Sequence, residues 1–411
     1  MMKRAIIGIS FVLLFTVGLA TVSADNGLRP WDHGRNPAFF DLGAREYAEL
    51  GFSVDVSGAN SVMALSDIFS KELVIDLDEI YEKTPDRGMR LGSSIGTEQH
   101  LSVKLDRIGF GFFGNTRSFT RLTVPKEFIG LITQGNELDG SYSDSTELAQ
   151  RSFTQAGAYA TYEYLGFVFG GKFSTFAPLV YTDSNAKATF ELATAADGTI
   201  EGEVSASGDV YTSAGEDGLV GTGFNLSLGV VRPDENGKAL YGGAINSIPL
   251  VAARPGYAFN LEKTRFTFTT DSILDAINND RDPFSTSDTE GEADTVALDE
   301  GDRPKIHMPI SISGFYRFAV PVVDVVPSAE IVFGDYARLN AEVNVEGNFF
   351  PVNILSVGFG HTDSLWHAGA GLRAPLRVFE LELQVRSVGT EIAGVFDGRG
   401  IGATLALALG Y

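Results

Sequence analysis

The chain has 411 residues and no cysteine, which excludes disulfide bonds and thiolate metal sites. Its 53 acidic residues outnumber the 31 basic ones, and the formal net charge of −22 argues against nucleic acid as a partner. Beyond the amino terminus no run approaches the roughly eighteen apolar residues of a spanning helix, so any membrane crossing must use strands.

The amino terminus has the pattern of a secretory signal. Lys3 and Arg4 precede an apolar run over residues 5–20, and Val22-Ser23-Ala24 supplies the small residues of a cleavage site. We therefore predict a signal peptide over residues 1–24 that is removed after secretion through the inner membrane.

Residues 25–50 have no clean period and are predicted to pack inside a larger structure. Proline fixes φ, asparagine can turn the chain, and two phenylalanines offer apolar anchors. Two alternatives stay open: the segment bends into a lumen and closes it as a hatch, or it packs under the fold without gating. The residues that carry this prediction are Asn36, Pro37, Ala38, Phe39 and Phe40.

Two short helices are predicted after the first strand, at residues 66–69 and 73–83, in the lumen or on the periplasmic side. Another short helix is predicted at residues 126–133, inside or outside the lumen. Over residues 101–112 an alternating apolar pattern changes phase between Leu105 and Ile108. A phase change inside one strand is typical of a bulge or bend, which is what we predict here.

Residues 271–303 interrupt the strand pattern. They hold eleven acidic residues, with only Arg281 and Arg303 as bases. A loop of this length belongs outside a compact domain, so we predict a long acidic loop outside the bilayer. The segment does not fit the EF-hand pattern, and weak cation binding stays an open question.

The last hundred residues contain successive runs in which apolar and polar residues alternate. Examples are residues 339–346, 366–373 and 379–386. An Arg or Lys facing hydrocarbon at mid-depth would cost about 2–4 kcal/mol, and Asp or Glu less, so the apolar face must point to lipid and the charged face inward. The predicted inward side chains are Arg338, Glu342, Glu346, His367, Arg373, Glu380, Glu382 and Arg386.

These inward charges have two interpretations. They can tune the selectivity of a pore for its solute, or they can pair with one another so that a filled interior is electrostatically satisfied. Across the ladder, Arg373, Glu380, Glu382 and Arg386 lie on neighbouring strands and are suited to such pairing.

Residues 400–411, GIGATLALALGY, alternate with period two and end on an aromatic residue. Leu405, Leu407, Leu409 and Tyr411 share the apolar face. This ending resembles the closing strand of bacterial outer-membrane β-barrels, which the barrel insertion machinery reads, so these four residues are the predicted insertion signal.

The whole pattern predicts an all-β fold: a transmembrane antiparallel barrel over residues 51–411, with about fourteen strands and twelve or sixteen as alternatives. An amino-terminal segment in the lumen and a few short helices complete the expected architecture.

Two family resemblances support this fold. Asn36-Pro37-Ala38 resembles the amino-terminal segment of the long-chain fatty-acid transporter superfamily, which implies a hatch inside a fourteen-stranded barrel. A longer likeness is to an uncharacterised family of outer-membrane barrels best represented in Bacteroidetes and spirochaetes. It is based on Asn36-Pro37-Ala38-Phe39, PKEFIGLITQGN at residues 125–136, Glu163-Tyr164-Leu165-Gly166 and residues 272–274. It implies a barrel in the outer membrane.

These features predict a passive or gated outer-membrane transporter for small solutes, hydrophobic ones included. The alternative is a structural or assembly-partner barrel with a plugged lumen. Expected partners are the lipid bilayer, the barrel insertion machinery and other envelope proteins. No cofactor or metal is expected. Nor is an enzyme, because the five histidines show no metal-binding spacing and no nucleophile motif is present.

Overall fold

The computed structural model describes most of the chain after the amino terminus. The described residues are 35–43, 47–64, 77–134, 141–182, 186–195, 200–215, 218–260, 265–270, 289–290, 296–320, 322–334, 337–350, 353–376 and 378–410. The predicted signal peptide at residues 1–24, most of the acidic segment and Tyr411 lie outside them.

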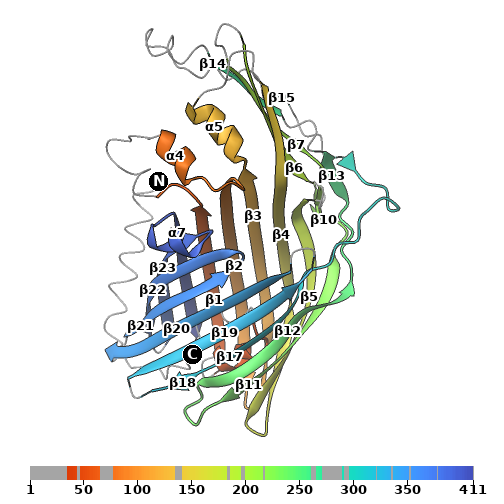
Figure 1. The fold of residues 1–411 in the computed structure, drawn as a ribbon. Coiled ribbons are helices and arrows are strands. Elements are labelled where there is room, and N and C mark those ends of the chain that lie inside the picture. Colours follow the sequence, from red (N-terminus) through yellow and green to blue (C-terminus); the bar gives the residue numbers. More distant parts are fainter. Residues whose placement is uncertain are drawn as a thin grey trace, which may run out of the picture.

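Fourteen strands form a closed antiparallel barrel (Figure 1). In order around the barrel they are β1 (Ala48–Asn60), β2 (Met89–Leu105), β3 (Ile108–Val124), β4 (Ser141–Tyr164), β5 (Phe167–Thr182), β11 (Gly223–Pro233), β12 (Ala239–Val251), β17 (Ile310–Tyr316), β19 (Val323–Phe333), β20 (Arg338–Phe350), β21 (Asn353–Thr362), β22 (Leu365–Pro375), β23 (Phe379–Gly389) and β24 (Gly400–Gly410). This confirms the predicted strand number and fold class.

The last strand closes the barrel on the first. β24 pairs antiparallel with β1, with Leu405 opposite Val54 and Leu409 opposite Leu50. Closure gives every barrel strand a partner on both sides, so no edge is left with unpaired backbone groups in lipid.

The outer face of the barrel is apolar. Along β24, Ile401, Leu405 and Leu409 are exposed, whereas the alternating Thr404 and Ala406 are buried inside. Large apolar side chains continue this band around the barrel, among them Phe52, Phe112, Phe173, Ile312, Val343, Val357 and Val385. This band is the surface that contacts the lipid bilayer and makes the protein a transmembrane barrel of the outer-membrane type.

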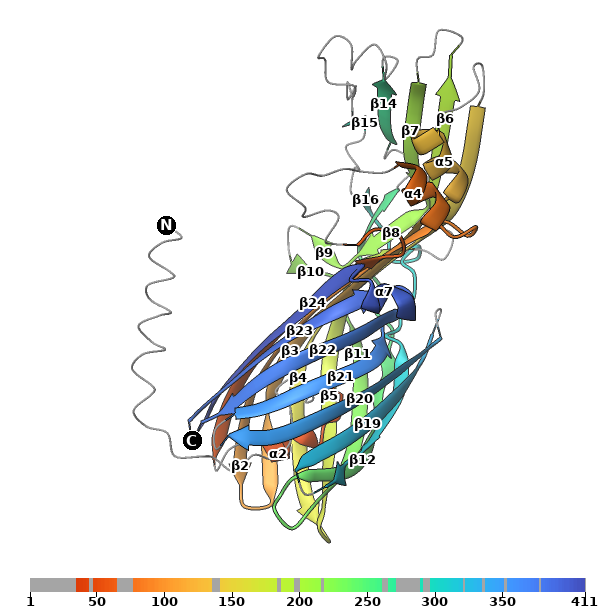
Figure 2. The ribbon, with the colours of Figure 1, turned by 60° about the vertical axis from the view of Figure 1, so that its left-hand side comes forward.

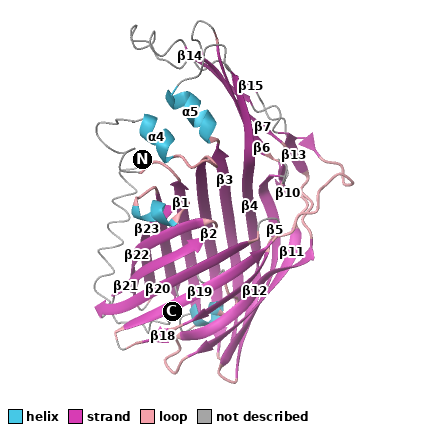
Figure 3. Ribbon diagram, viewed as in Figure 1, coloured by secondary structure: helices cyan, strands magenta, loops and turns pink. Residues whose placement is uncertain are grey.

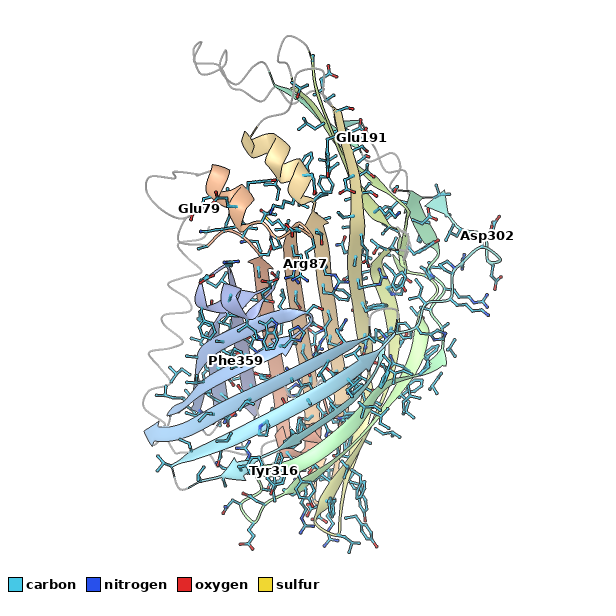
Figure 4. The ribbon with its side chains drawn as sticks, in the orientation of Figure 1. Glu79, Arg87, Glu191, Asp302, Tyr316 and Phe359 are labelled. Carbon is cyan, nitrogen blue, oxygen red and sulfur yellow. The ribbon has the colours of Figure 1, made fainter. Side chains whose placement is uncertain are left out.

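One end of the barrel has short turns and an aromatic rim. The rings of Tyr241 and Tyr316 stack with their centroids 6.1 Å apart, and Tyr316 also contacts Phe318 at 4.5 Å. Phe318 lies on the short strand β18 (Phe318–Ala319), and Figure 4 labels Tyr316 at this end. Outer-membrane barrels have short turns on the periplasmic side and aromatic residues at the interface, so this is the periplasmic end.

The phase change near Leu105 is a turn, and the predicted bulge is wrong. β2 ends at Leu105, β3 begins at Ile108, and these two residues pair across a two-residue loop in which Asp106 has φ of 53°. Residues opposite each other in a hairpin share a face, whereas residues three apart in one continuous strand do not. The change of phase is therefore the signature of a chain reversal.

The opposite end carries a sheet that rises above the barrel (Figure 2). The upper part of β4 pairs with β6 (Lys187–Thr194), and β7 (Ile200–Ser207) joins β6 to β14 (Arg265–Thr270). Smaller strands flank it: β8 (Asp209–Thr212), β9 (Ala214–Gly215), β10 (Gly218–Leu219), β13 (Tyr257–Asn260), β15 (Thr289–Glu290) and β16 (Val296–Ala297). β15 and β16 pair with β14 and β13, so part of the acidic segment belongs to strands.

The helices of the loop end are short (Figure 3). They are α4 (Leu77–Lys83), α5 (Lys126–Gln134) and α7 (Ile392–Phe396). Phe128 of α5 packs against Phe190 of β6 with ring centroids 5.0 Å apart. The helix predicted at residues 126–133 therefore forms, and the one predicted at 73–83 forms over its described part, α4. α4 lies at the loop end, so the lumen or periplasmic side was the wrong place for it. The helix predicted at residues 66–69 lies outside the described residues. No helix among the described residues is long and apolar enough to cross a membrane.

Candidate functional site: the lumen and its hatch segment

Residues 35–43, called here the hatch segment, lie inside the barrel. They include the helix α2 (Phe39–Gly43), which Figure 2 shows inside the barrel, toward the end with the short turns. Asn36, Ala38 and Phe40 are 3%, 0% and 1% exposed, and Pro37 and Phe39 are also buried. All five predicted hatch residues thus lie in the lumen. Whether they gate it stays a prediction.

Asn36 forms the turn and attaches it to the wall. Its Oδ1 accepts a hydrogen bond from the backbone nitrogen of Ala38 at 3.0 Å, and its Nδ2 donates to the carbonyls of Val230 at 3.3 Å and Gly243 at 3.2 Å. One amide therefore holds the local turn and ties it to β11 and β12. Pro37 suits this turn because its φ is already fixed.

Glycines in the wall make room for this turn. A Cβ added at Gly170 would overlap the backbone of Pro37 and Ala38, and one added at Gly229 would overlap the side chain of Asn36. Both glycines face inward. Their missing side chains create the recess that the hatch segment fills.

Aromatic contacts hold the helical part of the hatch segment. The ring of Phe40 stacks on Tyr159, with centroids 3.8 Å apart and planes 12° apart, and also contacts Phe113 and His100. Phe39 packs on Phe315 at 5.3 Å. Stacked rings of this kind add about 0.5–1.5 kcal/mol beyond burial alone.

A polar contact completes the attachment. The carboxylate of Asp41 is buried, lies 3.2 Å from Lys104 Nζ and accepts a hydrogen bond from Thr161 Oγ1 at 3.3 Å. A buried carboxylate needs such partners, because burial without them would be unfavourable. The hatch contacts described here are made by side chains, the amide of Asn36 included, without strand pairing to the barrel.

Replacing Phe40 with alanine is expected to loosen the hatch segment without unfolding the barrel. The change removes the stack on Tyr159, and a buried Phe→Ala change typically costs about 3–5 kcal/mol, which here falls on the hatch. Amide hydrogen exchange over residues 35–43 should accelerate at least tenfold, while exchange in β20–β24 stays unchanged. Unaltered exchange in the hatch segment would contradict this assignment.

The predicted inward charges lie on the wall opposite most of the hatch contacts. Glu342, Glu346, His367, Arg373 and Glu382 are buried, whereas Arg338, Glu380 and Arg386 are half-buried. All eight alternate with the lipid-facing residues of β20, β22 and β23. Their effect on selectivity is not tested by their positions alone.

Ion pairs fill the lumen near the short turns. Arg317 Nη1 lies 2.9 Å from Asp324 and 3.7 Å from Glu346, and Arg373 also lies 3.7 Å from Glu346. Sequence reasoning missed Arg317 and Asp324, because they flank a turn rather than a long alternating run. The buried cluster and the hatch segment occupy this end of the lumen together.

A second group of polar side chains joins the first strand of the barrel to its last two strands. Arg386 of β23 pairs with Asp55 of β1, and Asp55 also accepts a hydrogen bond from Thr404 Oγ1 at 2.6 Å. Asp55 was missed as well. Its place in the alternating run that begins β1 was the available signal.

A cavity of about 170 Å³ lies between the hatch segment and the part of the wall that carries these charges. Its lining includes Asn36, Phe39, Phe315, Glu342, Asn344 and Arg386. One water needs about 10–15 Å³ on the same measure, so the space can hold a small organic molecule. A smaller cavity of about 40 Å³ next to it shares Asp55, His367 and Arg386.

Among the residues that the structure describes, no group of three or more His, Asp or Glu side chains is arranged to hold a metal ion. His361, Asp363 and His367 lie on or beside the neighbouring strands β21 and β22, and Asp363 pairs with Arg338 at 3.1 Å.

Comparisons with known proteins find similar structures and no close relative. No protein-family model matches the chain, and no curated protein matches its sequence. The toluene transporter TbuX of Ralstonia pickettii is similar over 96% of this chain and 97% of its own, with 9% identity and a TM-score of 0.48. The toluene transporter TodX of Pseudomonas putida covers 96% of each chain at 9% identity and a TM-score of 0.45.

A FadL homologue of Pseudomonas aeruginosa is also similar, over 95% of this chain and 99% of its own, at 10% identity and a TM-score of 0.40. At identities of 9–10%, these matches are similarities in overall structure alone. What each of them carries is a property of that protein.

Proposed function

We propose that this protein is a gated outer-membrane transporter for a small solute, closed here by the hatch segment. The observation that carries the proposal is the cavity of about 170 Å³ whose boundary on one side is the hatch segment itself. Asn36 and Phe39 line this cavity, and they belong to a segment that no strand pairing ties to the barrel. Moving the segment would enlarge the passage while leaving the wall intact.

The lining of the cavity bears on the kind of solute. Phe39 and Phe315 offer an apolar surface, while Glu342, Asn344 and Arg386 offer polar groups. A wholly apolar solute would offer these polar groups no hydrogen bond, which is unfavourable. A solute with an apolar body and one polar group satisfies both parts of the lining.

The plugged structural barrel is the second candidate. The ion pairs of Arg317, Glu346 and Arg373 and the burial of the hatch segment would serve such a barrel equally well. A solute-sized cavity above them has no role in it. We therefore place transport first. The insertion machinery, proposed to read Leu405, Leu407, Leu409 and Tyr411, would act on either barrel.

Removing residues 25–43 tests the proposal. Without the hatch segment, the lumen loses Asn36, Phe39 and Phe40, so single-channel conductance in planar bilayers should rise severalfold over that of the mature full-length protein. β1 starts at Ala48 and is retained, so the barrel itself is preserved. Failure of both forms to conduct, with the barrel shown to be folded by its resistance to SDS at room temperature, would overturn transport in favour of the structural barrel.

A further inference from the structure

The cavity is richer in acid than in base. Its lining holds four arginines against six carboxylates, which are Asp55, Glu98, Glu330, Glu342, Glu346 and Asp363. The whole chain has the same sign, with a formal net charge of −22. A field of this sign raises the local concentration of cations over anions. An excess of negative charge alone does not define a site, but it favours a positively charged ligand.

A niche in the wall gives this excess a definite place. Gly358 of β21 faces inward, and a Cβ there would lie 2.5 Å from Asn344 Oδ1 and 3.6 Å from Glu342 Oε1. The two oxygens from β20 therefore lie over the same glycine. Because Gly358 has no side chain, the inward space above it is left to these two oxygens.

Asn344 is the second, independent observation. Its side chain is 2% exposed and lines the cavity, yet its Oδ1 has no hydrogen-bond partner among the described residues. Nearly all buried polar atoms in proteins are paired, so an unpaired one on a residue that lines a cavity indicates a missing donor. His367 Nε2, 3.8 Å from Glu342 Oε1, also lacks a hydrogen bond in the described part of the chain.

The chemistry of this pair selects the ligand. A primary ammonium has three N–H donors and no acceptor, and it can donate to Glu342 Oε1 and Asn344 Oδ1 at once. A carboxylate ligand would be repelled by Glu342 and would offer Asn344 Oδ1 no donor. The lumen therefore favours a protonated amine over an organic acid of the same shape.

Glu342 also links this niche to the hatch segment. Its Oε2 lies 3.4 Å from Nη1 of Arg35, the first described residue of that segment. An incoming ammonium competes with Arg35 for the same carboxylate. Binding at the niche would therefore weaken one contact that holds the hatch segment in place.

We propose that Glu342 and Asn344 form a subsite for the ammonium group of a small amine, and that its occupation displaces Arg35 of the hatch segment. The aromatic pair of Phe39 and Phe315 lines the same cavity, so an aromatic amine is the best-matched ligand class. This inference rests on the proposed transport function for its role. Binding itself can be measured without transport.

Calorimetric titration of the full-length mature protein in detergent with 2-phenylethylamine, at neutral pH, tests the subsite. Glu342→Gln should weaken binding about tenfold or more, and Asn344→Leu about three- to tenfold, as expected for hydrogen bonds to a charged group. 2-Phenylacetate should not bind measurably. Glu191→Gln removes the same charge at an exposed position on β6, labelled in Figure 4, and should leave binding unchanged.

Equal binding of the amine and the acid, or amine binding unaffected by both lumen variants, would overturn the subsite. Two variants are needed so that misfolding of one leaves the test intact. If the amine does not bind while removal of residues 25–43 still raises conductance, the subsite fails and transport stands. If the amine binds but neither form conducts, the subsite stands and the transport function fails.

Discussion

Replacing Leu405 with arginine is expected to prevent the protein from assembling in the outer membrane. Leu405 is the middle residue of β24, faces outward with 39% of its surface exposed, and lies opposite Val54 of β1 and Leu383 of β23. A guanidinium at mid-depth in lipid costs about 2–4 kcal/mol. This strand also closes the barrel, so the penalty falls on the last pairing that assembly requires.

The matched control is the same substitution one residue earlier. Thr404 faces inward, lines the cavity and already bonds to Asp55, so an arginine there has both space and a carboxylate partner. The amount of folded barrel in the outer-membrane fraction, read from its heat-modifiable migration on gels, should fall at least tenfold for Leu405→Arg and much less for Thr404→Arg. Equal loss in both variants would mean that the assignment of faces on β24 is wrong.

The alternation of β20 to β24 could be predicted because one physical rule governs each position. Charged residues such as Glu342 and Arg386 are directly next to apolar ones such as Val343 and Val385 in the sequence, and only one of the two sets tolerates hydrocarbon. A barrel in lipid must also be closed, since open edges are not stable there. The fold class, and the direction of each side chain toward lipid or lumen, therefore follow from the local sequence pattern.

The contents of the lumen could not be predicted in this way. Asn36 is about two hundred residues away in sequence from its two carbonyl partners, Val230 and Gly243. The role of Gly170, which is to make room for Pro37, is visible only once the chain is folded. Likewise, Asn344 and Gly358 become a niche through the register of β20 with β21. Register across strands is set by the whole barrel, which a single sequence pattern does not contain.

The sheet above the barrel was missed for a related reason. Residues 141–150 and β6 alternate like the barrel strands, but the alternating polar residues are Ser, Thr and Glu in water. Period two does not distinguish a lipid-facing strand from one half-buried in a soluble sheet. Phe128 of α5, which covers Phe190, shows that the apolar face here is a small core outside the membrane.

Gly170→Val is expected to dislodge the hatch segment and open the lumen. The new side chain would occupy the space of the Pro37–Ala38 peptide, and backbone cannot yield as a flexible side-chain tip can. β5 is paired along its length with β4 and β11, so the displaced part is the hatch segment, which is held mainly by Asn36, Phe40 and Asp41. Conductance should rise severalfold, approaching that of the chain lacking residues 25–43.

The adjacent glycine supplies the control. Gly171 points to the outer face, where an added Cβ meets only Leu228 Cδ2 at 3.9 Å, an ordinary contact. Gly171→Val adds the same β-branched residue to the same strand and should leave conductance at its original level. Because valine suits a strand at both positions, a difference between the two variants isolates the hatch contact from the stability of β5. A closed Gly170→Val barrel would show that the hatch segment is no barrier to solute passage.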